Sequence, residues 1–459
     1  MTQTSLSAKS DSFNFSALVK DVKVALIIQL TGLLLIYLVK VFLARWMGKT
    51  EYGIYEYVIS WSLLLAIPAG LGFPRTVLRL ISEYRVKQDW GRLGGIIRGS
   101  LLLTILNSIL LCLVSTGLIL LLNHYHSFAY AKPLLIGIWL VPLQALVQLF
   151  LETARAMKDV TLAYAPSLVI WPILLLSGGL FFWQRNHALR SITTIEMAMV
   201  MLAIALSFQL WLLWGKLNTE VEQTTPIYNY REWISIALVL LLQAGFKEIL
   251  NQTDIVMVGS VIGAEEAGIY SAAVKTAEWV AFSLQTVNIV VAPVFTTLYV
   301  QGDRQELQNL VSKVTVWMFW SSLAVAAILI IFAQPVMRLF GSDFVVAHWQ
   351  LKILVLGQLV NALCGSVGFL LIMTGHQNKA VFIYGYAALS NIVLNGVLIP
   401  IFGSIGAAIA TSLTMAMWNV WLSFLVIKHL GIYPSVFYSF FRRKGDRALD
   451  SSSGNNSSN

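Results

Sequence analysis

Apolar runs of about 20 residues follow one another along this chain from Val24 to Lys428. Each run is long enough for a helix that crosses a hydrocarbon core about 30 Å thick. Of the 459 residues, 58% are hydrophobic and only 12% are charged, whereas soluble domains carry about 25% charged residues. The sequence therefore predicts an all-α polytopic membrane protein with about twelve transmembrane helices. Their centres are expected near Leu34, Leu64, Ile109, Val141, Trp171, Ala205, Leu241, Leu284, Val325, Leu359, Ser390 and Leu422.

The basic residues lie in the short polar links between these runs. The net charge is +9, but the basic residues do not line one amphipathic face, so no nucleic-acid partner is predicted. With the N-terminus inside, most of the Lys and Arg residues in the links fall on the inner side, whereas the outer link GAEEAG is acidic. The positive-inside rule then predicts that both termini are cytoplasmic.

One short phrase occurs twice. GKTEYGIY (Gly48–Tyr55, the first phrase) returns as GAEEAGIY (Gly263–Tyr270, the second phrase) with Gly, Glu, Gly, Ile and Tyr at matching positions. We expect each phrase to form a hairpin in which the first Gly ends a helix, the Glu opens the next, and the Tyr lies in an interfacial aromatic belt. Met157-Lys158-Asp159 and Gln377-Asn378-Lys379 give a second echo at similar spacing. The repeats predict duplication of a six-helix unit.

This duplication sets the expected domain organisation. Two pseudo-symmetric six-helix lobes would face each other across a central cavity, as in a transporter. The predicted segments are a cytoplasmic polar N-terminus (1–17), an N-terminal lobe (18–215), a cytoplasmic linker (216–232), a C-terminal lobe (233–430) and a cytoplasmic tail (431–459) that is basic and then disordered.

Three stretches carry a family resemblance: RWMGKTEYGIYEY with GLGFPRTVLRLISEY, then NQTDIVMVGSVIGAEEAGIYSAAVKTAE, and GSIGAAIATSLTMAMWNVWLSFLVIKHLG. They resemble the polysaccharide-biosynthesis flippases, the Wzx-type branch of the multidrug/oligosaccharidyl-lipid/polysaccharide (MOP) superfamily. The resemblance implies a MATE-like fold and alternating access in a bacterial inner membrane. Its implied substrate is a polyprenyl-diphosphate-linked oligosaccharide, moved from the cytoplasmic to the outer leaflet for surface polysaccharide such as O-antigen. Membrane lipids, and a glycan polymerase or other assembly proteins, are the implied partners.

Charged and amide side chains inside the predicted spans indicate a site. Gln243, Lys247, Asn251 and Asp254 are spaced by four, four and three residues, which places them on one helical face. The next span carries Lys275 and Glu278, and the first span carries Lys40. Each intramembrane charge costs about 2.5–3.5 kcal/mol on insertion scales, so these faces must meet protein or water.

The predicted site is a wet central cavity. Lys40, Lys247 and Lys275 are the candidates that receive a diphosphate, while Gln243, Asn251, Asp254 and Glu278 complete the lining. The alternative is structural: Lys247 would pair with Asp254, and Lys275 with Glu278, to hold the helices together.

Other sequence features argue against an enzyme. The chain contains neither a GxxxxGK[ST] loop nor an HExxH motif, and its Cys112 and Cys364 lie inside predicted spans. We therefore predict no catalytic residue, metal or cofactor. The alternatives are a cation-coupled multidrug exporter of the same superfamily, which would need a cavity dominated by carboxylates, and a polyprenyl-linked glycan polymerase or ligase, which would need a large outer loop. A scaffolding membrane protein is a more distant alternative.

Overall fold

The computed structural model describes residues 15–125, 129–186, 188–220, 224–436 and 438, and every regular element in these ranges is helical. Ten segments of this described part are long and apolar enough to cross a membrane. The first of them, Lys23–Ala69, contains 47 residues, and Gly48 (φ 76°, ψ 170°) divides the corresponding helix α1 (Phe15–Ala69) in two. Each of the twelve predicted centres lies within a helix. The prediction of an all-α polytopic membrane protein is confirmed.

The N-terminal half continues from α1 with short and long helices in alternation. Asp159 shows how the chain starts one of them, because its carboxylate accepts a hydrogen bond (2.9 Å) from the backbone N–H of Leu162. The elements are α2 (Phe73–Val86), α3 (Trp90–Tyr125), α4 (Ala131–Gly137), α5 (Leu140–Ala156), α6 (Val160–Ala165), the π-helical turn η1 (Pro166–Ile170), α7 (Trp171–Asn186) and α8 (Ser191–Glu220).

The C-terminal half begins with three long helices in succession before shorter ones follow. Asp303 caps one of its helices by accepting a hydrogen bond (2.9 Å) from the backbone N–H of Glu306. The elements are α9 (Tyr230–Val261), α10 (Ala264–Gln301), α11 (Arg304–Ile331), α12 (Ala333–Arg338), the 3₁₀ turn η2 (Ser342–Ala347), α13 (His348–Cys364), α14 (Val367–Met373), α15 (Gln377–Phe402) and α16 (Ser404–Leu430).

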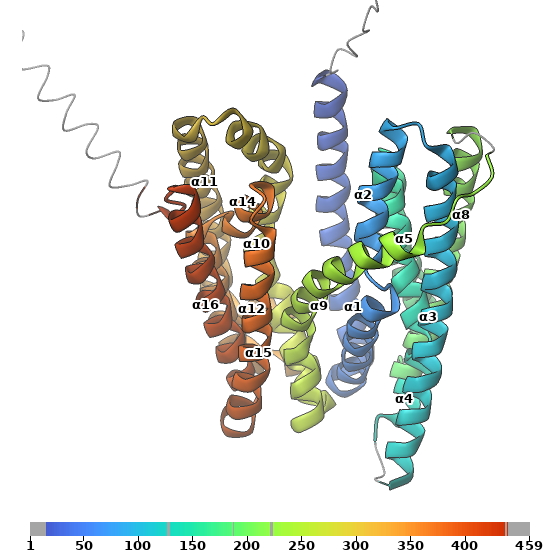
Figure 1. Cartoon of the computed structure of the whole chain (residues 1–459). Coiled ribbons are helices and arrows are strands. Elements are labelled where there is room, and N and C mark those ends of the chain that lie inside the picture. The colour runs from blue at the N-terminus through green and yellow to red at the C-terminus, as the bar shows by residue number, and fades with distance from the viewer. Residues whose placement is uncertain (1–14, 126–128, 187, 221–223, 437, 439–459) are drawn as a thin grey trace, which may run out of the picture.

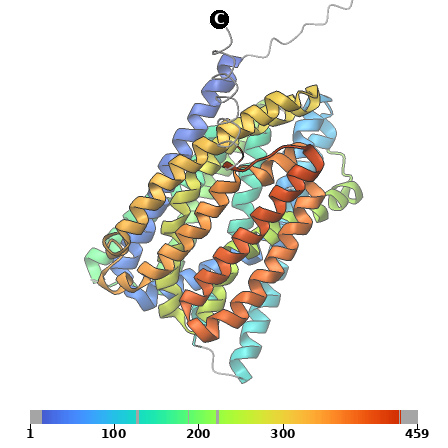
Figure 2. The same ribbon diagram turned by 90° about the vertical axis from the view of Figure 1, so that its left-hand side faces the viewer.

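The helices stand in two groups. In Figure 1, α10, α11, α14, α15 and α16 lie on one side, and α2, α3, α5 and α8 lie on the other, with α1 between them. Figure 2 turns the C-terminal group toward the viewer, where its long helices run side by side. The two halves meet through α1, which packs on α9 and α10, and through α2, which packs on α9.

Helix α9 belongs to both groups, as its oblique course in Figure 1 shows. Trp233, near its start, is buried in a cluster with Phe73 and Val77 of α2. Leu250, farther along, is buried with Ala387 and Ala388 of α15. The predicted lobe boundary at residues 232 and 233 remains a prediction, but the first turns of α9 pack on the N-terminal half. Two parts of the predicted terminal segments lie outside the described residues: 1–14 of the N-terminus and 439–459 of the tail.

The repeated phrases form hairpins as predicted. Gly48 and Gly263 both have positive φ angles, 76° and 134°, which glycine adopts without a Cβ penalty. The tyrosines differ from expectation, because Tyr55 and Tyr270 are 1% and 0% exposed. They do not lie in an interfacial belt, because α1 and α10 pack against each other and bury both rings in the largest core cluster.

Candidate functional site

One face of α9 carries exposed polar groups in the middle of a predicted span. Lys247 and Asn251 are exposed, and Gln243 is partly exposed. The span containing them, Tyr230–Val261, is one of the ten apolar segments. Among the described residues, no carboxylate lies within 4.0 Å of the Lys247 ammonium. An ammonium without a counter-ion at this depth has to face water or a polar ligand.

One basic group of the N-terminal half lies near Lys247. Arg75 of α2 is close enough for electrostatic interaction with it, as is Glu248 on α9 itself. The Arg75 side chain is 57% exposed, and its Nε lies 3.7 Å from Glu152 Oε1. The other oxygen of Glu152 accepts a 2.7 Å bond from Arg155. We call Arg75, Gln243, Lys247 and Asn251 the exposed polar face.

Lys40 is in the opposite situation. It is 9% exposed, and its ammonium donates to Glu56 Oε1 at 2.5 Å. It also lies over the ring of Tyr55, 5.3 Å from the centroid. The second oxygen of Glu56 accepts a 2.9 Å hydrogen bond from Ser271 of α10, in the other half. Lys40 is therefore fully compensated, and its partner bridges the two halves.

Asp254 is buried and does not pair with Lys247. Its Oδ2 accepts hydrogen bonds from the Tyr270 hydroxyl (2.7 Å) and the Thr411 hydroxyl (3.2 Å). Of the two structural ion pairs considered from the sequence, the described residues form one: Lys275 donates to Glu278 at 2.7 Å. Asp254 differs from its neighbours on the same helical arc because the end of α9 packs against α10 and α16.

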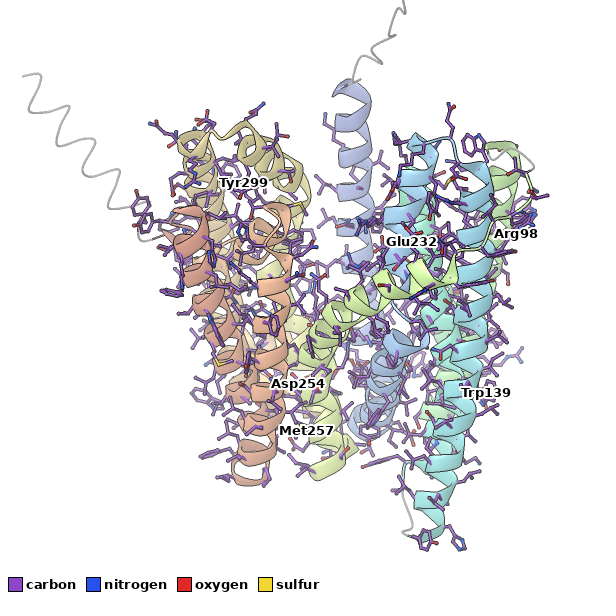
Figure 3. The ribbon with its side chains drawn as sticks, in the orientation of Figure 1. Arg98, Trp139, Glu232, Asp254, Met257 and Tyr299 are labelled. Atoms are coloured by element: carbon purple, nitrogen blue, oxygen red, sulfur yellow. The ribbon has the colours of Figure 1, made fainter. Side chains whose placement is uncertain are left out.

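These groups form a second region. Lys275 lies near both Glu56 and Asp254, so the three charges share one zone where α1, α9 and α10 meet. We call Lys40, Glu56, Asp254, Tyr270 and Ser271 the buried polar layer, with the pair Lys275–Glu278 at its edge. In Figure 3, Glu232 marks the end of α9 that packs near α2, while Asp254 and Met257 lie toward its other end.

The structure thus divides the predicted site residues. Gln243, Lys247 and Asn251 stay together on the exposed polar face, whereas Lys40, Asp254, Lys275 and Glu278 belong to the buried layer or its edge. The sequence did not indicate roles for Glu56 or Glu248. Arg75, near the inner end of the second predicted span, was equally compatible with contact to lipid headgroups and with contact to substrate. The available signal for Glu56 was another charged residue inside the apolar segment Lys23–Ala69, 16 residues from Lys40.

Comparison with solved structures identifies the fold. The fold matches an inward-facing multidrug resistance MATE family transporter of the MOP superfamily with a TM-score of 0.75 at 12% identity, covering 87% of this chain and 94% of that one. It matches the lipid II flippase MurJ in an inward closed conformation with a TM-score of 0.63 at 16% identity, covering 92% and 93%. The chain therefore shares the fold of these two proteins.

Sequence comparison defines the family. The model described as polysaccharide biosynthesis protein matches residues 18–299, and the model described as MatE matches residues 236–397. The chain belongs to the polysaccharide biosynthesis protein family, as the resemblance of its repeated phrases indicated. It is also 22% identical over 392 residues to the probable low-salt glycan biosynthesis flippase Agl15 of Haloferax volcanii, covering 83% of this chain and 77% of that protein.

Proposed function

We propose that this protein is a flippase that moves a polyprenyl-diphosphate-linked oligosaccharide from the cytoplasmic to the outer leaflet by alternating access. The observation that carries the proposal is Lys247: a lysine in mid-span, exposed, without an ion pair among the described residues, and beside Arg75 of the opposite half. A diphosphate brings about two negative charges, which bare hydrocarbon would not tolerate. Lys247 and Arg75 supply matching positive charge.

The neighbouring groups suit the rest of the substrate head. Gln243 and Asn251 offer amide donors and acceptors on the same face as Lys247, and sugar hydroxyls bond both. The polyprenyl tail remains in lipid, so that only the polar head has to cross through protein. Lys40 and Lys275 complete the proposed site with Asp254 and Glu278, but each of these lysines must first exchange its present carboxylate partner for phosphate.

The same proposal sets the orientation. In this proposal the membrane is a bacterial inner membrane, and the basic links support cytoplasmic termini. The phrase hairpins at Gly48 and Gly263 would then face outward. The relatives support a glycan substrate, because one of them is named as a probable glycan biosynthesis flippase. A role in surface polysaccharide such as O-antigen, with a polymerase or other assembly proteins as partners, follows from this assignment. No catalytic step or cofactor enters the proposal.

The test is translocation in proteoliposomes. Purified protein is reconstituted with a polyprenyl-diphosphate oligosaccharide, and an external lectin counts the heads that reach the outside over time. We expect transfer faster than in protein-free liposomes, and a drop of about tenfold or more for Lys247→Ala, because a charge-assisted hydrogen bond contributes about 1.5–3 kcal/mol. Lys87→Ala is the matched control, since it removes a lysine that pairs with Glu83 at the exposed end of α2.

One result would overturn the role assigned to Lys247, and another would overturn the flippase function itself. A wild-type rate in Lys247→Ala would remove the role of that lysine. Absence of transfer for several glycans, together with efflux of a cationic drug by the same liposomes, would make the protein a multidrug exporter, and the carboxylates Asp254 and Glu278 would then be the groups to substitute.

A further inference from the structure

The two repeated phrases pack directly on each other. A Cβ placed on Gly53 would lie 1.7 Å from the carbonyl oxygen of Ala264, and one placed on Gly268 would lie 2.6 Å from the carbonyl oxygen of Lys49 and 2.9 Å from the Cα of Gly53. Only glycine permits backbones to approach so closely. The second part of α1 and the start of α10 therefore cross at these two glycines, and we call this contact the phrase crossing.

Each phrase is bonded to its own half through the glutamate that both copies of the repeat carry at the same position. Glu51 accepts a 2.7 Å hydrogen bond from the backbone N–H of Ser191, at the start of α8. Glu266 accepts a 2.6 Å bond from the hydroxyl of Ser404, at the start of α16. Because each phrase is anchored within its half, the crossing can separate as a contact between two rigid bodies.

Other bonds across the halves cluster at the same end. Lys49 pairs with Glu265 at 2.7 Å, with both side chains partly exposed. The Tyr57 hydroxyl lies 3.0 Å from that of Ser260. Glu56, next to Tyr57 in the sequence, accepts a hydrogen bond from Ser271 of the other half and another from Lys40. Separation of the crossing would break all three links and admit water to Lys40.

Water changes the Lys40–Glu56 pair. Charge attraction falls about fourfold when the effective dielectric constant rises from that of a protein surface to that of water. Glu56 would also lose its bond to Ser271. A diphosphate, with more charge than one carboxylate, would then compete for Lys40. In the closed arrangement the same lysine is 9% exposed and unavailable.

We propose that the phrase crossing is the outer gate of the transport path, and that Glu56 masks Lys40 until the gate opens, when Lys40 becomes a second binding site for the diphosphate. The masked-site part rests on the function proposed above, whereas the gate does not depend on the substrate. The substrate head would thus meet Lys247 while the path is open inward and Lys40 once it opens outward.

The gate is tested by labelling, with no substrate present. Cys112 and Cys364 are replaced by alanine, and Ser60→Cys is introduced one turn beyond Glu56, at a position that is 1% exposed. A membrane-impermeant maleimide is then applied from outside. We expect slow labelling in this parent and labelling about tenfold faster or more with Gly53→Ala, because the added Cβ prevents closure. Gly117→Ala is the matched control, since a Cβ there meets no atom within 4 Å. Unchanged labelling in folded Gly53→Ala overturns the gate.

A second measurement covers the case in which Gly53→Ala does not fold. Lys49→Cys and Glu265→Cys replace the exposed pair in the same cysteine-free background. A short bis-methanethiosulfonate reagent then bridges them, and a reductant cleaves the bridge. We expect the bridged protein to lose transport and the reduced protein to recover it. Full transport by the bridged protein also overturns the gate. A reduced protein that transports no oligosaccharide counts against the proposed function instead, and the labelling result still decides the gate.

The masked cation is tested by the double variant Lys40→Gln/Glu56→Gln, which removes both charges and leaves neutral groups to bond each other. We expect Ser60→Cys labelling to remain slow, as in the parent, while transport falls about tenfold. The control is Glu83→Gln/Lys87→Gln, which removes a pair of the same type on the exposed surface of α2. Transport at the parent rate, or a gate that no longer closes, shows that the pair is structural and overturns the masked site.

Discussion

Lys247 and Lys40 are the same residue type in predicted spans, yet the fold treats them in opposite ways. Lys247 is exposed and has no ion pair among the described residues. Its charged neighbour from the other half is Arg75 of α2, which is a cation and not a carboxylate. Lys40 is buried, paired with Glu56, and linked through it to Ser271. The difference shows that intramembrane charge alone does not identify a binding residue. The partners decide whether a lysine is ready for a ligand or is held within the structure.

The largest expected effect is the contrast between Lys40→Ala and Lys247→Ala in stability. Lys40→Ala leaves Glu56 as an uncompensated buried carboxylate, and breaking such a pair costs about 3–5 kcal/mol. Lys247→Ala removes an exposed side chain and should change stability by about 0.5 kcal/mol or less. Thermal unfolding of both variants in the same detergent measures the difference. Equal melting temperatures would show that the Lys40–Glu56 pair contributes no more stability than an exposed group.

The next effect concerns the phrase crossing. Gly268→Leu forces a side chain into a contact in which even a Cβ lies 2.6 Å from a carbonyl oxygen, so we expect destabilisation of the closed arrangement by about 1–3 kcal/mol. Gly117→Leu, which enters open space, should be near neutral. Thermal unfolding and external thiol labelling of the two variants check this. A Gly268→Leu protein as stable and as closed as Gly117→Leu would refute the tight crossing.

A smaller effect is expected at the edge of the buried polar layer. Lys275 and Glu278 form an ion pair whose side chains are 21% and 40% exposed, and pairs of this kind contribute about 0.2–1 kcal/mol. Lys275→Ala should therefore leave the melting temperature nearly unchanged, between the results for Lys247→Ala and Lys40→Ala. A loss as large as that of Lys40→Ala would place Lys275 inside the buried layer rather than at its edge.

The smallest effect lies outside both regions and depends on pH. Asp159 links two spans through its bond to Lys216. Partial burial raises the pKa of its carboxyl group, but the bonds from Lys216 and from the N–H of Leu162 have the larger combined effect. The pKa of Asp159 is therefore lowered from its ordinary value of 3.8. A carboxylate whose pKa is lower in the folded state than in the unfolded state stabilises the fold at pH values above its unfolded-state pKa. This stabilisation is lost as the pH falls through the folded-state pKa. Asp159→Asn keeps an oxygen at the N-cap and loses the ion pair with Lys216, so it should cost about 0.2–0.5 kcal/mol at neutral pH. Melting temperatures of the variant and parent should converge below pH 3.8; a constant gap would contradict this.

The sequence was sufficient for the fold because the signals were local. Apolar runs predicted where helices lie, and the glycines at 48 and 263 predicted where two of them end. It was less informative for Tyr55 and Tyr270, whose burial depends on the meeting of α1 and α10. Helices distant in sequence create such environments, and helical spacing does not encode them.

The site shows the same limit. Helical spacing placed Gln243, Lys247 and Asn251 together, and the structure keeps them on one face. Asp254 shares that arc but is buried, because α9 changes its neighbours along its length. The approach of Arg75 to Lys247 joins residues far apart in the chain, and only tertiary structure brings them together.

The phrase crossing also has a consequence for the origin of the chain. Gly53 meets Ala264, and Gly268 meets Lys49; these two contacts are related by the same offset, because 268 minus 53 and 264 minus 49 both equal 215. Reciprocal contacts of this kind define an isologous interface in a twofold homodimer. In an ancestor of two identical six-helix subunits, one glycine would have served both sides of that interface. On the duplication predicted from the repeats, the single polypeptide would preserve the dimer contact of a protein half its length.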